Sequence, residues 1–454
     1  MIDLKNIQRI YFLGIGGIGM SALARYFNLH GKTVTGYDKT STTLTRELEK
    51  EGIHITFEDK VETLDKEAEL IIYTPAIPTN HLQYNWYIQN KFTILKRAQI
   101  LGLAANSMFN ISIGGSHGKT STSSIAAHIL KTANKSVAAF LGGICVNFNS
   151  NFIDGNEYAV AEADEFDRSF LNLKPNIALI TSVDTDHLDI YGNLEAIEDS
   201  FHQFCKNVHS DGKLITHIHV ADKILNKHVQ NYRYSLDNSQ ADYYAKNLSI
   251  CDGTYTFDVV HPNGIIENVI SYYGGKHNIE NAIGAIAIAL NIGISAEDIR
   301  CAIASFKGVK RRFETHVRNE NVIYIDDYAH HPRELDATIS ATKELYPSKK
   351  ITVIFQPHLF SRTNDLCDEF ALSLSKADKL ILLDIYPARE KPIEGVSSRI
   401  IFDKVSIDDK HLSTKDEFIS FIKSQNDIEV VLTVGAGDID TKINELKTYL
   451  ETKK

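Results

Sequence analysis

Residues 111–122, Ile-Ser-Ile-Gly-Gly-Ser-His-Gly-Lys-Thr-Ser-Thr, have the residue types and order that bind a nucleotide phosphate. An apolar strand leads into a glycine-rich turn and a helix, so backbone N–H groups and the helix N-terminus would surround an anion. Lys119 would supply a point charge for the β- and γ-phosphates, and the Thr120 hydroxyl would reach a magnesium ion. The loop is shorter than a standard P-loop, because Ile113 stands where a glycine is expected, five positions before Gly118. A plain turn is the alternative interpretation.

Acidic side chains gather where a later strand ends. Glu162 closes the strand expected over residues 158–162, and Asp164, Glu165 and Asp167 follow it. Four carboxylates so close together would repel one another without a cation, and carboxylate oxygens are ligands that magnesium prefers. Glu162, nearest the strand, is the best candidate ligand, and a solvated acidic loop is the alternative.

A second acidic cluster, Asp184-Thr-Asp-His187, follows the strand expected over residues 176–182. Open α/β sheets bind their ligands at the carboxyl ends of strands. We therefore expect His187 to lie beside the lysine loop, although a lone histidine there could also be an ordinary polar loop residue.

Another glycine loop, Gly14-x-Gly16-x-x-Gly19, follows an apolar strand and opens a helical run. In this pattern the glycines permit a tight turn, the approach of a diphosphate to the backbone, and close helix–strand packing. Asp38 ends the next strand, where an acidic residue can bind a ribose hydroxyl. NAD, FAD and a UDP-linked substrate all fit this loop, and tight packing alone is the alternative.

Two sets of polar residues fit a ligand-binding role and a purely structural role equally well. His277, Asn278 and Asn281 open the helix expected over residues 278–290, where they would either bind the edge of a purine or cap the helix. The turn Lys310-Arg-Arg312 would either steady a transferring phosphate or form an exposed basic turn. Both alternatives stay open on these residues alone.

Two strand ends in the last third of the chain carry aspartates, histidines and an arginine: Tyr324-Ile-Asp-Asp-Tyr-Ala-His-His-Pro332 and Phe355-Gln-Pro-His-Leu-Phe-Ser-Arg362. Adjacent histidines rarely bind one metal, and the helical spacing H-E-x-x-H of zinc enzymes is absent. We therefore expect an edge that binds an anion or a substrate rather than a zinc ion.

The elements that would position these residues form three similar segments, each opening with a strand, a turn and a helix. This alternation predicts an α/β protein with mainly parallel sheets. We expect domain boundaries near residues 108 and 315, which gives domains over residues 1–108, 109–315 and 316–454. A β-hairpin is expected around Pro262-Asn-Gly264.

Composition narrows the class of protein. The 454 residues are 43% hydrophobic and 23% charged, as in soluble globular proteins, and exceed what one core usually holds. The net charge of −10 argues against a nucleic-acid partner. Because there is neither a bilayer-spanning apolar run nor a signal-peptide core, we expect a cytoplasmic protein without a membrane partner. Five scattered cysteines argue against disulfides and a thiolate metal site.

Together the motifs resemble the Mur ligase family of ATP-dependent amide-forming enzymes, in order and over essentially the whole chain. The resemblance implies an N-terminal Rossmann-like domain, a central P-loop ATPase-like domain with a mostly parallel sheet, and a C-terminal Rossmann-like domain. These would bind a UDP-linked substrate, ATP and an amino acid, respectively.

The resemblance also assigns roles to individual residues. Those implied for ATP are Gly115, Ser116, His117, Gly118, Lys119, Thr120, Ser121, His277, Asn278, Asn281 and Arg312. Those implied for the UDP-linked substrate are Gly14, Ile15, Gly16, Gly17, Ile18, Gly19, Asp38, Thr74 and His187. The implied catalytic residues are Lys119, Asp327, His330 and Arg362, and those on the amino-acid side are His330, His358 and Arg362. Two magnesium ions, which manganese could replace, would be bound by Thr120, Glu162 and His187.

Within the family, residues 14–24, 326–332 and 355–358 are similar to members that join L-alanine to UDP-N-acetylmuramate in peptidoglycan precursor synthesis. That activity implies ATP-dependent formation of an acyl phosphate, attack by the amine, and a tetrahedral intermediate that releases phosphate beside ADP. A monomer or a weak homodimer is expected.

Alternatives remain. The related ligase that recycles a murein tripeptide shares much of the pattern, but its first glycine loop usually differs. Leu359 stands where some relatives carry arginine, which leaves Arg362 as the cation of that motif. Other members use a carbamylated lysine, which we do not expect because residues 194–205 contain no lysine. An NAD-dependent oxidoreductase and a nucleotide-binding regulator without catalysis are alternatives from other classes.

Overall fold

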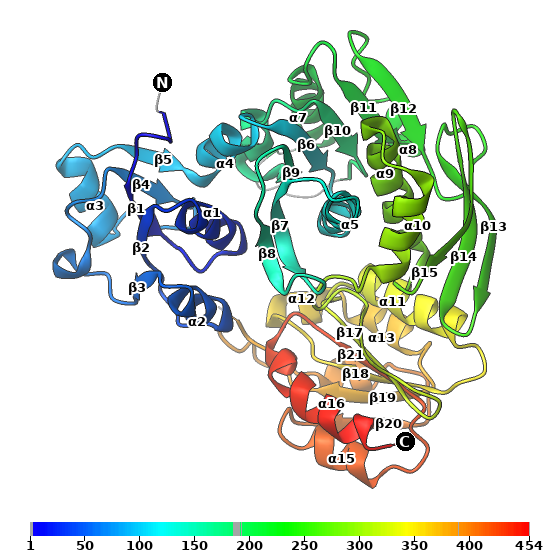
Figure 1. Cartoon of the computed structure of the whole chain (residues 1–454). Helices are drawn as coiled ribbons and strands as arrows, with labels where there is room; N and C mark the ends of the chain where they lie inside the picture. The colour runs from blue at the N-terminus through cyan, green and yellow to red at the C-terminus, as the bar shows by residue number, and fades with distance from the viewer. Residues whose placement is uncertain (1–2, 185–190, 192, 389, 454) are drawn as a thin grey trace. The chain divides into compact units, whose positions relative to one another are not determined.

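The computed structural model describes residues 3–184, 191, 193–388 and 390–453, which form an α/β protein in two compact units (Figure 1). The first unit comprises Met1–Lys246, Phe257–Val269 and Glu280–Phe306. The second comprises Asn247–Thr256, Ile270–Ile279 and Lys307–Lys454. The expected fold class is confirmed. Among the described helices we find none with the length and hydropathy of a membrane span.

The N-terminal sheet of the first unit has five parallel strands in the order β3-β2-β1-β4-β5. They are β1 (Arg9–Leu13), β2 (Thr33–Tyr37), β3 (His54–Thr56), β4 (Leu70–Tyr73) and β5 (Ile94–Lys96). The helices are α1 (Ile18–Leu29), α2 (Thr43–Lys50), α3 (Leu82–Gln89) and α4 (Arg97–Ala105), with a 3₁₀ turn over Val61–Thr63. The strand order reverses between β1 and β4, and open α/β sheets bind ligands at such a reversal.

The second sheet of this unit has seven strands in the order β12-β11-β10-β6-β9-β7-β8, and only the β7–β8 pair is antiparallel. The strands are β6 (Phe109–Gly114), β7 (Val137–Cys145), β8 (Ser150–Ile153), β9 (Tyr158–Ala163), β10 (Ile177–Ile180), β11 (Lys213–His217) and β12 (Gln230–Tyr234). Because β6 lies between β9 and β10, the carboxyl ends of all three meet at one edge.

Helices of the middle part of the chain are α5 (Lys119–Thr132), α7 (Leu194–Lys206), α8 (Ile218–Ala221), α9 (Lys276–Ile292) and α10 (Ala296–Ser305), with a 3₁₀ segment over Phe166–Asn172. A three-stranded sheet contains β13 (Tyr244–Cys251), β14 (Thr254–His261) and β15 (Gly264–Ser271). The expected hairpin is confirmed as β14 and β15. The Ser295 side chain accepts the N–H of Asp298 and so caps the start of α10.

The sheet of the second unit has six strands in the order β16-β17-β21-β18-β19-β20. They are β16 (Glu314–Arg318), β17 (Ile323–Asp327), β18 (Ile351–Phe355), β19 (Lys379–Leu383), β20 (Lys410–Ser413) and β21 (Val430–Val434), and only β16 is antiparallel. The helices are α11 (Pro332–Leu345), α12 (Phe360–Asp365), α13 (Cys367–Leu374), α14 (Arg399–Phe402), α15 (Phe418–Ser424) and α16 (Ile443–Glu451), with a 3₁₀ turn over Asp438–Lys442.

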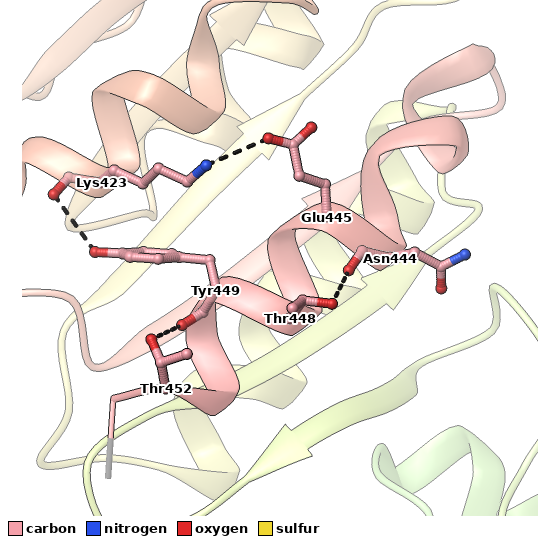
Figure 2. A pocket seen from close by; sticks show the side chains of 6 residues that line it. All are labelled: Lys423, Asn444, Glu445, Thr448, Tyr449 and Thr452. Atoms are coloured by element: carbon pink, nitrogen blue, oxygen red, sulfur yellow. Dashed lines mark hydrogen bonds and ion pairs between the residues drawn. The ribbon is translucent and has the colours of Figure 1, made fainter.

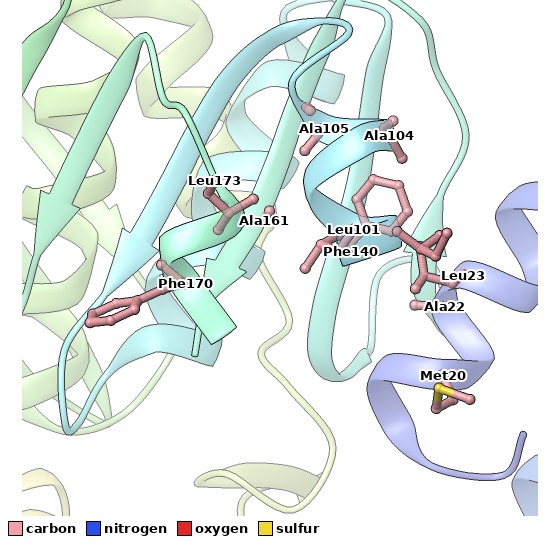
Figure 3. Packing of buried hydrophobic residues seen from close by; sticks show 14 of the residues in the cluster. Met20, Ala22, Leu23, Leu101, Ala104, Ala105, Phe140, Ala161, Phe170 and Leu173 are labelled. Carbon is pink, nitrogen blue, oxygen red and sulfur yellow. The ribbon is translucent and has the colours of Figure 1, made fainter. Parts of the chain in front are cut away.

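One hydrophobic core continues through both sheets of the first unit. Figure 3 shows Leu23 of α1, Leu101 of α4 and Phe140 of β7 in the same buried cluster. Tyr26 of α1 also packs on Phe140, with ring centroids 5.5 Å apart. This core crosses the boundary expected near residue 108, which stays a prediction, and it holds α1 and α4 in place against the central strands.

Candidate active site

The lysine loop lies between β6 and α5, and its shape requires two glycines. Gly115 has φ 133° and Gly118 has φ 80°, both in the region that favours glycine. A Cβ atom at Gly115 would lie 2.1 Å from Thr181 Oγ1, and one at Gly118 would lie 2.5 Å from Asn281 Oδ1. Neither position can carry a side chain unless a neighbour moves.

Lys119 is the first residue of α5, and its ammonium group lies within its own loop. Its Nζ donates to the carbonyl oxygens of Gly115 and Ser116. The same atom lies 2.9 and 2.8 Å from the two carboxylate oxygens of Glu165. Because Glu165 is only 2% exposed, water screens this ion pair little. A buried carboxylate therefore holds the predicted phosphate-binding charge in the loop.

Glu162, at the end of β9, faces the start of α5. Thr120 Oγ1 donates to Glu162 Oε2 at 3.1 Å, and Ser123 Oγ donates to Oε1 at 3.1 Å. The backbone N–H of Gly142 on β7 also donates to Oε1. Within the described ranges, no group of three or more His, Cys, Asp or Glu side chains is arranged to hold a metal. The Thr120 and Glu162 oxygens nevertheless fit magnesium, which usually takes few protein ligands and completes its shell with phosphate and water.

The rest of the acidic segment is neutralised by the chain itself. Arg97 Nη2 lies 3.0 Å from Asp164 Oδ2, and Lys96 Nζ lies 2.8 Å from Asp167 Oδ2. With Glu165 already paired, three of the four carboxylates have a basic partner. Basic side chains therefore supply the positive charge for these three carboxylates, and magnesium binding by Glu162 stays a prediction.

The end of β10 supports the other side of the lysine loop. Ser182 accepts the N–H of Ser116 through its carbonyl and the N–H of His117 through its hydroxyl, both at 3.0 Å. The backbone N–H of Asp184 donates to Ser116 Oγ at 2.9 Å, and its carboxylate lies 3.4 Å from His117 Nε2. His187, expected to bind metal and substrate, lies outside the described residues.

The residues expected to bind adenine lie on α9. Asn281, in the first unit, accepts a hydrogen bond from Thr122 Oγ1 at 3.2 Å and lies against Gly118. Asn278, in the second unit, donates to the carbonyl of Gly274 at 2.7 Å. That contact ties the helix start to the preceding turn. The Asn278 amide donates in it, whereas an N-cap side chain accepts a helix N–H, so capping by Asn278 stays a prediction. Adenine binding by these residues and by His277 stays a prediction.

The first glycine loop brings its predicted residues together at the reversal of strand order. A Cβ atom at Gly14 would lie 2.6 Å from Thr74 Cγ2, so these residues are in close contact. The Asp38 carboxylate accepts the N–H of Gly16 at 2.7 Å, and its ribose role stays a prediction. Helix α1 begins with no side-chain cap and no acidic residue in its first turn. Its first N–H groups have no partner within the helix and suit an anion.

Two aspartates end β17 in the second unit. Asp326 is fully buried and lies 3.2 Å from Arg311 Nε. Asp327 accepts the backbone N–H groups of Phe313 and Ala329, each at 2.7 Å. Burial raises the pKa of Asp327 to about 6. Asp327 therefore shapes the backbone around this strand end, and a direct catalytic contact stays a prediction.

His330 and His358 lie together at the same sheet edge, with ring centroids 6.1 Å apart. His330 Nδ1 lies 2.9 Å from the Tyr328 carbonyl, which can only accept, so Nδ1 carries the proton and a neutral ring leaves Nε2 as an acceptor. Burial lowers the pKa of His358, and the charge of Arg362 lowers it further. His358 Nδ1 and Arg362 Nη1 are buried without hydrogen-bond partners among the described residues, as expected of groups that await a polar ligand.

Comparison with known proteins agrees with this geometry. Residues 9–108 match the catalytic-domain model of the Mur ligase family, residues 113–289 the Mur ligase middle domain, and residues 311–437 the Mur ligase glutamate ligase domain. The UDP-N-acetylmuramate–L-alanine ligase of Parabacteroides distasonis is 48% identical over 99% of this chain and 98% of its own. The chain belongs to the Mur ligase family.

Two further relatives of this Mur ligase match nearly its whole length. The UDP-N-acetylmuramate–L-alanine ligase of Flavobacterium psychrophilum is 47% identical over 100% of both chains. The solved UDP-N-acetylmuramate-alanine ligase of Thermotoga maritima has a TM-score of 0.84 and 27% identity, and covers 98% of this chain and 100% of its own. Membership of this family excludes the oxidoreductase interpretation of the first glycine loop.

The basic turn of this Mur ligase contains a residue that the sequence did not distinguish. Arg311, which had no predicted role of its own, pairs with buried Asp326 and donates to the carbonyls of Gly435 and Gly437. Arg312 is exposed, so an interaction with phosphate stays a prediction for it. The positive φ of Arg311, 60°, belongs to the turn that sends the two side chains to different surroundings.

A groove of about 530 Å³ in this Mur ligase lies away from all these residues. It is lined by Lys423 of α15, by residues of α16 and by Thr452 just after that helix, and Figure 2 shows the hydrogen bonds and the ion pair that these residues make. Lys423 Nζ lies 3.3 Å from Glu445 Oε1, so the main charges of the groove neutralise each other. None of the residues expected to carry the chemistry lines this groove.

Proposed function

We propose that this Mur ligase joins L-alanine to the lactyl carboxylate of UDP-N-acetylmuramate, converting ATP to ADP and phosphate, in peptidoglycan precursor synthesis. The observation that carries the ATP-dependent step is Lys119 in a glycine-shaped loop next to Thr120 and Glu162. The other two substrates follow from the names of relatives that are 46–48% identical over nearly the whole chain.

The chemistry needs an activated carboxylate, because joining a carboxylate to an amine is uphill in water. A carboxylate oxygen would attack the γ-phosphorus of ATP and ADP would leave, which gives an acyl phosphate. The neutral amine of L-alanine would then attack the acyl carbon, and the tetrahedral intermediate would expel phosphate. The protein would contribute mainly position and charge stabilisation to these steps.

The first unit would bind ATP and the UDP-linked substrate. The N–H groups of residues 115–120 and the Lys119 ammonium would bind the phosphates, and the first glycine loop would bind the UDP part. Thr120 and Glu162 would hold magnesium, with His187 as a further expected ligand. When bound, the metal would supply positive charge that offsets the charge of the phosphate oxygens.

The second unit would bind the amino acid. The guanidinium of Arg362 suits the carboxylate of L-alanine, because its buried Nη1 has no partner among the described residues. His330 Nε2 is a free acceptor in the neutral ring and would take the proton that the attacking amine loses. His358, whose pKa is lowered, would stay neutral and accept or donate a hydrogen bond to the amino acid.

Phosphate release tests this proposal. The protein is incubated with ATP, magnesium, UDP-N-acetylmuramate and one amino acid, and phosphate is measured with L-alanine, glycine, L-serine or a murein tripeptide. We expect the fastest release with L-alanine and none without the UDP-linked substrate. Preference for the tripeptide would instead identify the recycling ligase, and release that needs no second substrate would indicate a nucleotide-binding regulator.

Two further expectations accompany the function. Since the reaction consumes ATP, we expect the protein in the cytoplasm, where ATP is abundant. We also expect a monomer or a weak homodimer, which sedimentation at several protein concentrations measures. A mass that stays at twice the chain mass on dilution would contradict the second expectation.

A further inference from the structure

One cation of the first unit lies between the first glycine loop and the acidic segment after β9, and it has no role in the chemistry described above. Arg97 is the first residue of α4, next to the first glycine loop. A Cβ atom at Gly19, in the first turn of α1, would lie 2.9 Å from Arg97 Nη1. On its other edge, Arg97 Nη2 lies 3.0 Å from Asp164 Oδ2. The two edges of one guanidinium therefore face the start of α1 and the acidic segment.

The charge at this point favours an anion. Helix N-termini carry partial positive charge, and α1 has no acidic residue in its first turn to offset it. Arg97 adds a full positive charge beside the same turn, and its side chain is only 19% exposed. Asp164 offsets part of this charge through Nη2, but Nη1 on the other edge and the start of α1 face the same place, where a negatively charged ligand would be stabilised. A diphosphate has that charge, and guanidinium binds phosphate oxygens through paired N–H groups.

The surroundings hold Arg97 in this orientation. Asp164 Oδ1 accepts the N–H of Phe166 at 3.1 Å, so the carboxylate that pairs with Arg97 is itself fixed. Leu23 of α1 and Leu101 of α4 belong to the same buried cluster, which prevents the two helices from moving independently (Figure 3). The guanidinium is therefore placed before any ligand arrives, which lowers the entropy cost of binding.

We propose that Arg97 positions the UDP-linked substrate: Nη1 binds its diphosphate at the start of α1, while Nη2 stays on Asp164. This inference rests on the proposed function, because it assigns the diphosphate of that substrate to the first glycine loop. It adds Arg97 as a binding residue and Asp164 as the residue that positions it. It also explains why position 19 is glycine, since a side chain there would push the guanidinium away.

Calorimetric binding of UDP tests the proposal without requiring turnover. We expect Arg97→Gln to weaken UDP binding at least about tenfold, which corresponds to about 1.4 kcal/mol. Arg97→Lys should recover part of the loss, because it keeps the charge but not the two-edged geometry. In the ligation assay Arg97→Gln should raise KM for UDP-N-acetylmuramate by a similar factor, with KM for ATP changed less than about twofold.

Lys96→Gln is the matched control, because it removes one positive charge from the adjacent residue and breaks a similar ion pair, with Asp167. We expect it to change UDP binding less than about twofold. Asp164→Asn tests whether Asp164 positions Arg97. As a single substitution it should weaken UDP binding about threefold. In a protein that already carries Arg97→Gln it should have no further effect, as expected for two residues that act together.

Equal losses in Arg97→Gln and Lys96→Gln would overturn the proposal, as would UDP binding within about twofold of wild type in Arg97→Gln. If Arg97→Gln lowers the melting temperature by many degrees, the Arg97→Lys and Asp164→Asn comparisons decide instead. If the wild-type protein binds UDP but forms no amide, the proposed function is contradicted. The role of Arg97 is then decided by the UDP affinities of the variants alone. A wild-type protein that does not bind UDP would overturn both.

Discussion

Replacing Gly118 by alanine should damage the lysine loop in two separable ways. A left-handed backbone costs a residue with a Cβ atom about 1–2 kcal/mol, and overpacking a tight site costs about 1–3 kcal/mol. Both apply here, since Gly118 has φ 80° and its Cβ atom would lie 2.5 Å from Asn281 Oδ1. We therefore expect Gly118→Ala to lower the free energy of unfolding by roughly 2–5 kcal/mol.

The chain offers a matched control for the backbone part of this loss. Gly31 has φ 75° and no atom within 4 Å of an added Cβ, so Gly31→Ala should cost only the conformational part, about 1–2 kcal/mol. Urea unfolding of both variants measures how much more unfolding free energy Gly118→Ala loses than Gly31→Ala. In the phosphate-release assay, Gly118→Ala should also raise KM for ATP at least about tenfold, because it would displace the helix start that we propose to bind phosphate. Gly31→Ala should leave KM for ATP unchanged.

A double variant identifies the cause of the extra loss. Asn281→Ala alone should cost about 1 kcal/mol, because Thr122 loses a hydrogen-bond partner. If the contact with Asn281 is the cause, Gly118→Ala with Asn281→Ala should be more stable than the sum of the single losses predicts. Equal losses in Gly118→Ala and Gly31→Ala, or strict additivity in the double variant, would refute the reasoning.

Three further predictions concern the charged groups. Lys119→Ala should abolish nearly all phosphate release in a protein that still folds, and substantial residual ligation would contradict its role. Its melting temperature should fall, because the buried Glu165 carboxylate loses its ion-pair partner. The pKa of Asp327 is raised to about 6 from an unfolded value of 3.8, so its protonated form stabilises the fold below pH 4 and that contribution is lost as the pH rises through 6. The melting temperature of Asp327→Asn minus that of the wild type should therefore rise between pH 4 and pH 7, because only the wild type loses this contribution. A temperature difference that does not change with pH would be inconsistent with the raised pKa. Arg362→Lys should raise KM for L-alanine at least about tenfold with KM for ATP nearly unchanged, because an ammonium cannot replace the paired guanidinium contact; parallel changes in both constants would argue against an amino-acid site.

Local patterns in the sequence determined the class of fold and the existence of the loops. A strand, a glycine turn and a helix are neighbours along the chain, so the lysine loop at residues 115–120 and the glycine loop at residues 14–19 could be predicted from their order. The place of Glu162 at a strand end was predictable for the same reason, because the mainly apolar run before it, residues 158–161, is local. The parallel sheets and the hairpin of β14 and β15 also follow from local periodicity and turn residues.

The partners of the charged side chains were decided by the tertiary structure. Arg97 and Asp164 are 67 positions apart, and Lys119 and Glu165 are 46 apart, so no short pattern could pair them. Arg311 and Arg312 are adjacent and chemically identical, and only the turn decided which one neutralises Asp326. Local spacing in the sequence specifies which groups can bind phosphate. The partner of each charged side chain depends instead on which strands and helices the core brings together.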